Sequence, residues 1–141
     1  MFDKPPNDDT RPYAAIQVCD HNLCGLLDSG SSVTIVGNNS HSHLLSFGLT
    51  LHTDVIKHFT TAGGQCLVAI GYINLPVTFE KQFHILRAYV IPSVTSNLIL
   101  GIDFWTKFKL FPKFSKSISF HSNEYITSEI TSVSKTNILL H

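Results

Sequence analysis

The chain contains 141 residues, a length that suits one globular domain and is short for two. Hydrophobic residues make up 43% of the sequence, enough to fill a core, so the chain as a whole is not expected to be disordered. Ten basic residues balance ten acidic ones, which disfavours nucleic acid or an anionic membrane as a partner.

Residues 1–11 predict a flexible lead, because they include paired prolines and several Asp and Asn residues. This lead is polar and unlike a signal peptide, and no apolar run in the chain approaches the roughly 20 residues that span a bilayer. The odd set of cysteines, Cys19, Cys24 and Cys66, favours free thiols over a disulfide framework. We therefore expect an intracellular, cytoplasmic protein.

Short apolar runs separated by turn residues predict a mainly β domain over residues 12–120. Tyr13–Val18 and Leu23–Leu27 are expected to form a hairpin around Asp20-His21-Asn22, and Val33–Val36 a third strand. Further strands are expected within 55–79, with breaks at 62–65, 71 and 76, and at 84–91, 98–100 and 117–120.

Two short helices are expected among these strands. The first lies within Ser40–Leu51, with Ser40 as a possible N-cap and Gly48 as a possible C-cap. The second covers Ile102–Lys109, where an acidic residue near the start and basic residues near the end suit the helix dipole. Residues 121–141 are rich in Ser, Thr and Asn and predict a polar tail or linker.

One segment carries the clearest chemical signal. In Leu26-Leu27-Asp28-Ser29-Gly30-Ser31-Ser32-Val33, a carboxylate follows an apolar strand directly, and small residues separate it from the next one. Although an Asp-Ser-Gly turn alone is common, an acid placed between two core strands loses hydration unless hydrogen bonds or a partner compensate it. Asp28 is therefore a candidate catalytic acid.

Three segments together resemble the landmarks of retroviral and retrotransposon aspartic proteases: Leu27–Val33, the Gly63-Gly64 hairpin and Asn97–Trp105. Their order and spacing also match that family, and the likeness covers about residues 13–120. The resemblance implies a retropepsin-like fold, a single-lobed acid protease barrel that is mainly β and has one or two short helices. It also implies an aspartic endopeptidase that works as a homodimer through a shared active site.

The resemblance assigns roles residue by residue. Asp28 would be the catalytic acid, paired with Asp28 of a second chain, and Ser29 and Gly30 would support the catalytic loop. Substrate binding would fall to Ser31, Ser32 and the hairpin tip Ala62, Gly63, Gly64 and Gln65. The substrate would be a polypeptide, with polyprotein processing as the reaction's setting, and no cofactor or metal is implied. Many relatives pair an acid at the position of Ser32 with an Arg at that of Ile102, and both are absent here.

Two other interpretations stay open at this point. Metal sites can be drawn from His41-x-His43 with His52 or His58, or from Cys19-x-His21-x-x-Cys24. Neither has the spacing of a structural zinc site, so surface or packed histidines explain them better. The more serious alternative is a catalytically inactive retropepsin-like domain that dimerises or binds, for which Ser29 in place of the usual Thr leaves room.

Overall fold

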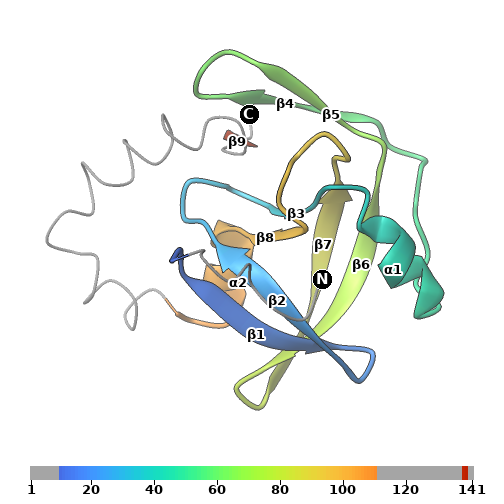
Figure 1. Ribbon diagram of the computed structural model, residues 1–141, viewed down its shortest axis with the longest axis vertical. Helices are drawn as coiled ribbons and strands as arrows, with labels where there is room; N and C mark the ends of the chain where they lie inside the picture. The colour runs from blue at the N-terminus through green and yellow to red at the C-terminus, as the bar shows by residue number, and fades with distance from the viewer. Residues whose placement is uncertain (1–9, 111–137, 140–141) are drawn as a thin grey trace, which may run out of the picture.

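Six strands close into a barrel in the order β1-β2-β8-β3-β7-β6, and a second sheet has the order β5-β4-β9 (Figure 1). This computed structural model describes residues 10–110 and 138–139. The expected lead over 1–9, the strand at 117–120 and most of the expected tail lie outside the described residues. The mainly β barrel with two short helices confirms the expected fold class.

The bounds of the elements follow the apolar runs of the sequence. The strands are β1 (Tyr13–Val18), β2 (His21–Leu27), β3 (Thr34–Val36), β4 (Lys57–Thr61), β5 (Cys66–Ala69), β6 (Gly71–Phe79), β7 (Gln82–Val90), β8 (Leu98–Leu100) and β9 (Ile138–Leu139). The helices are α1 (His41–Ser46) and α2 (Ile102–Lys107). β9 falls inside the stretch that was predicted to be a tail or linker.

Two hairpins of the barrel turn through left-handed residues that are not glycine. Cys19 and Asp20, with φ of 52° and 66°, connect β1 to β2, so the turn lies one residue earlier than expected and His21 already belongs to β2. Glu80 and Lys81, with φ of 49° and 67°, connect β6 to β7. Two residues with positive φ match the right-handed twist of the flanking strands, which favours these turns in spite of their side chains.

The core has two parts. One cluster fills the barrel and includes Ile16, Leu75 and Phe104, each at most 2% exposed. The other lies under the hairpin formed by β4 and β5. It includes Phe59 from that hairpin and Ile35 from the barrel strand β3. A fully buried aliphatic or aromatic side chain of this size contributes about 1.5–3 kcal/mol of transfer free energy, so both clusters stabilise the fold.

α1 lies within the expected range, and α2 ends two residues earlier than expected. Ser40 precedes α1, but its hydroxyl donates to Oδ1 of Asn97 at 2.9 Å and does not cap the helix. The left-handed Gly48, with φ of 92°, follows the end of α1, as a glycine after a helix commonly does. α2 stops at Lys107, and Lys109 adopts φ of 55°. Over the described ranges no helix has the length and apolar character needed to cross a membrane.

Candidate active site

Asp28 is the first residue after β2, and the barrel fixes its backbone. β2 pairs in parallel with β8, and the pairing ends at Leu27 and Leu100. The N–H of Asp28 then donates to the carbonyl of Leu100 at 3.1 Å, which extends the ladder by one bond. The Asp28 side chain is only 5% exposed, and its Oδ1 accepts a hydrogen bond of 2.9 Å from the N–H of Gly30. The carboxylate is therefore both buried and oriented.

The loop after Asp28 is tied to the start of α2. The N–H of Ser31 donates to the carbonyl of Asp28 at 3.1 Å, and the N–H of Ile102 donates to the carbonyl of Ser31 at 2.8 Å. The Ser31 hydroxyl, fully buried, donates to the carbonyl of Val33 at 2.7 Å. A Cβ on Gly101 would lie 2.4 Å from the carbonyl oxygen of Val33, so only glycine allows this approach.

Hydrogen bonds between Thr34 at the start of β3 and Asp103 in α2 were not predicted from the sequence. Oδ2 of Asp103 accepts a hydrogen bond from the N–H of Thr34 at 3.1 Å, and Oδ1 accepts one from the Thr34 hydroxyl at 2.9 Å. Burial raises the pKa of Asp103, and the hydrogen bonds from Thr34 and Phe104 oppose that rise. Ser32 and Ile102 are both uncharged, and in this chain the contact of Asp103 with Thr34 ties α2 to β3. An acid at the second residue of the predicted helix was the one available signal.

The hairpin of β4 and β5 has an exposed tip at Ala62–Gln65, as the paired glycines predicted. Gly64 adopts φ of 87°, and the N–H of Gln65 donates to the hydroxyl oxygen of Thr61 at 3.0 Å. The body of the hairpin is anchored by Phe59, whose ring meets that of Tyr89 edge-on with centroids 5.2 Å apart. The tip therefore projects from an anchored base.

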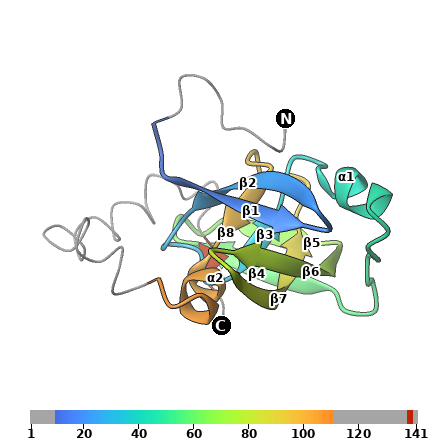
Figure 2. The ribbon, with the colours of Figure 1, turned by 90° about the horizontal axis from the view of Figure 1, so that it is seen from below.

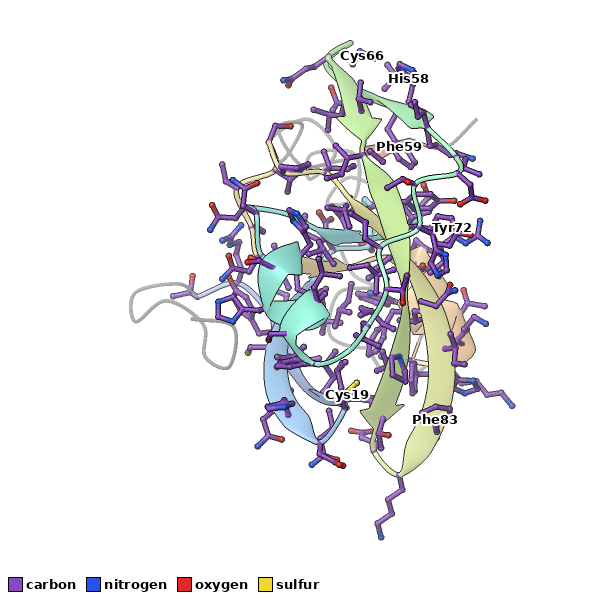
Figure 3. The ribbon with its side chains drawn as sticks, turned by 90° about the vertical axis from the view of Figure 1, so that its right-hand side faces the viewer. Cys19, His58, Phe59, Cys66, Tyr72 and Phe83 are labelled. Atoms are coloured by element: carbon purple, nitrogen blue, oxygen red, sulfur yellow. The ribbon has the colours of Figure 1, made fainter. Side chains whose placement is uncertain are left out.

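The hairpin and the loop after β2 lie on the same side of the barrel. Figure 1 shows the hairpin arching over the end of the barrel at which β2 gives way to β3, with β9 between the hairpin and that loop. The view from below shows β1 and β2 crossing one face of the barrel (Figure 2). In Figure 3, Cys66 and His58 lie at the far end of the hairpin and Phe59 lies nearer to the barrel.

The structure thus brings the predicted residues into two groups. Asp28, Ser29, Gly30, Ser31 and Ser32 form one loop, in which Ser29 and Ser32 are half-buried and the others are buried. The exposed hairpin tip forms the second group. Within residues 10–110 and 138–139 no three His, Cys, Asp or Glu side chains are grouped as ligands of a metal ion would be.

Comparisons with known proteins point to one family. The family described as "Aspartyl protease" matches residues 14–104. The chain is similar in structure to the retroviral protease-like domain of Ddi1 from Leishmania major, with a TM-score of 0.53, 18% identity and coverage of 71% of this chain and 78% of that one. It is also similar to the EIAV protease complexed with the inhibitor HBY-793, with a TM-score of 0.52, 19% identity and coverage of 75% and 95%. No curated protein sequence matches the chain.

Proposed function

The chain belongs to the aspartyl protease family, and from this premise we propose that it is an aspartic endopeptidase of retropepsin type. Asp28 would be its catalytic acid. Because one chain supplies one such acid, the working form would be a homodimer in which two Asp28 carboxylates meet. The substrate would be an extended polypeptide, and the processing of a polyprotein is the setting that we propose for the reaction.

The observation that carries this proposal is the way in which Asp28 is held. The Asp28 carboxylate is buried at the end of a core strand, where an ionised group is costly unless its surroundings compensate it. Hydrogen bonds to Gly30 and Leu100 fix its side chain and backbone. A buried acid in a fixed orientation is what general acid–base chemistry requires.

The chemistry follows from two carboxylates in contact. Both cannot ionise cheaply, so the pair shares one proton. The ionised carboxylate takes a proton from water as the water oxygen bonds to the peptide carbonyl carbon, and the protonated one donates to the carbonyl oxygen. The carbon–nitrogen bond of the resulting diol then breaks. The departing amine takes the proton that came from water, and one hydroxyl of the diol returns its proton to the other carboxylate as the carbonyl re-forms, so the pair again shares one proton. Cleavage should be fastest under mildly acidic conditions, since the shared proton is lost as the pH rises.

The other site residues would support this reaction. Ser29 would hydrogen-bond across the dimer axis beneath the Asp28 pair, and Gly30 would let the peptide backbone approach. The half-buried Ser32 would line the floor beside the peptide, and the buried hydroxyl of Ser31, which donates to the carbonyl of Val33, would hold the loop from beneath. The hairpin tip Ala62–Gln65 would close over the peptide and exclude water from the reaction.

The decisive experiment compares Asp28→Asn with the wild-type chain on an unstructured polypeptide such as casein. Asn keeps the side-chain oxygen that accepts from Gly30 but cannot act as the base, so cleavage should fall about 10³-fold or more while the thermal unfolding curve stays in place. Asp20→Asn, in the exposed left-handed turn, is the matched control and should cleave like the wild type. Equal cleavage by the wild type and Asp28→Asn, or none by either, would reject the catalytic proposal.

A concentration series tests the homodimer. Specific activity on a fluorogenic peptide should rise with enzyme concentration near the dimer dissociation constant, while sedimentation follows the monomer and dimer fractions in the same samples. Specific activity that stays constant in demonstrably monomeric protein would rule out the shared pair of Asp28 carboxylates.

A further inference from the structure

β4 has both of its hydrogen-bonding edges occupied. β5 pairs with one edge, from Lys57 opposite Ala69 to Thr60 opposite Cys66. β9 pairs with the other edge, with Thr60 opposite Leu139 and Thr61 opposite Ile138. A strand has only two such edges. An extended peptide that joins the hairpin by pairing with β4 must therefore displace β9.

The direction of the Thr61 amide shows which backbone groups of β4 face β9. The N–H of Thr61 donates to the carbonyl of Gln65, so it faces the β5 side of the hairpin. Successive amides along a strand point to opposite edges, so the N–H and carbonyl of Thr60 face β9. Thr60 and, two residues earlier, His58 thus turn their backbone groups to this edge, and β9 lies opposite Thr60.

β9 lies near the loop that contains the proposed catalytic acid (Figure 1). Figure 1 shows it between the hairpin and the loop that follows β2, the loop that begins with the buried Asp28. The sequence around β9, Thr136-Asn137-Ile138-Leu139-Leu140, has no charged residue and two adjacent aliphatic residues in the strand itself. An uncharged aliphatic segment of this kind favours an extended strand.

We propose that the segment around Ile138–Leu139 is an internal competitor for the peptide-binding edge of β4. The inference rests on the proposed function, because it takes this edge to be where the substrate binds. The segment belongs to the same chain as β4, so it competes at a high effective concentration even when its own affinity is weak. Release of β9 would be required before an extended peptide could be cleaved.

The test uses the full chain with Asp28→Asn, so that no probe is consumed. The probe is a fluorescent peptide of residues 134–141, added in trans. A second variant also carries Ile138→Pro and Leu139→Pro, which remove two backbone N–H groups and prevent strand pairing. This variant should bind the probe about tenfold or more tightly than the chain with β9 intact. Ser132→Pro with Val133→Pro is the matched control and should bind the probe as the intact chain does.

Hydrogen exchange gives an independent measurement. The Thr60 amide should exchange slowly with β9 intact and quickly in the Ile138→Pro, Leu139→Pro variant, whereas the Thr61 amide, bonded to Gln65, should be slow in both. Equal probe binding and an unchanged Thr60 amide would overturn the inference. If the wild-type chain and the proline variant both fail to cleave casein while probe binding and exchange still differ, the proposed protease function fails and the occupancy of the β4 edge stands.

Discussion

The loop after β2 and the hairpin of β4 and β5 lie on the same side of the barrel but are held in different ways. Backbone hydrogen bonds tie the loop on both sides, to Leu100 in β8 and to Ile102 in α2. The hairpin is anchored through side chains, chiefly Phe59, and its tip is exposed. The loop is thus fixed mainly by its own backbone, whereas the hairpin packs on the barrel through side chains and leaves its tip exposed. The following substitutions probe that contrast.

Phe59→Ala should have the largest effect, because it removes the aromatic ring that packs the hairpin against the barrel. The Phe59 side chain is 1% exposed, and truncation of a buried Phe costs about 3–5 kcal/mol. Hydrogen exchange should become faster in β4 and β5 and change little in β1 and β2. Val68→Ala, at a side chain that is 44% exposed, is the control and should lower the free energy of unfolding by less than about 0.5 kcal/mol. Uniformly faster exchange would show that hairpin and barrel unfold as one unit.

Gly101→Ala tests how rigidly the loop after β2 is held against the start of α2. The added Cβ would lie 2.4 Å and 2.6 Å from the carbonyl oxygens of Val33 and Ser31, and these are backbone atoms that cannot rotate away. We expect a loss of about 3 kcal/mol in the free energy of unfolding by urea, together with a large loss of cleavage as the loop shifts. A loss below about 0.5 kcal/mol would mean that the loop is not rigidly held.

Asp103→Ala removes the acceptor for both hydrogen bonds of Thr34 and should cost about 2 kcal/mol. Burial raises the pKa of Asp103 in the folded state, so the folded chain binds its proton more tightly than the unfolded chain. Protonated Asp103 therefore contributes its full share to the free energy of unfolding when the pH is below the pKa that it has in the unfolded chain. This contribution is lost as the pH rises through the higher pKa that Asp103 has in the folded chain. The gap in unfolding free energy between wild type and Asp103→Ala should therefore shrink as the pH rises from below the pKa of Asp103 in the unfolded chain to above its raised pKa in the folded chain. A gap that widens would contradict this sign.

Gly64→Ala, in the hairpin tip, should have the smallest effect. No atom lies within 4 Å of the added Cβ, so the only cost is that of holding Ala at φ of 87°. That cost is about 1 kcal/mol, well below the loss expected for Gly101→Ala. Thermal unfolding of both variants measures the difference, and equal losses would remove the distinction between the held loop and the exposed tip.

The apolar runs of the sequence located most of the barrel, because strand formation depends on local alternation and branching. β1 and β8 have the predicted bounds, and the loop that contains Asp28 follows β2 as expected. The β1–β2 turn was predicted one residue too late, and the turn at Glu80–Lys81 was not predicted, because neither contains a glycine and strand twist imposes their conformation.

Sequence patterns did not predict contacts between residues that lie far apart in the chain. The hydrogen bonds between Thr34 and Asp103 join residues 69 apart in the chain, and neither residue belongs to a motif that predicts the contact. β9 was missed for a related reason. A strand of two residues has no periodicity of its own, and its place is given by the free edge of β4.

The pairing of β2 with β8 has a consequence for the order of folding. Leu26 and Leu27 in β2 lie opposite Ile99 and Leu100, which the ribosome adds much later. Contacts between such distant segments close slowly, and a nascent chain acquires them only when the later segment has emerged. The loop that holds Asp28 is thus incomplete until synthesis has passed α2. During translation, the timing of assembly by itself keeps the acid from adopting its final geometry.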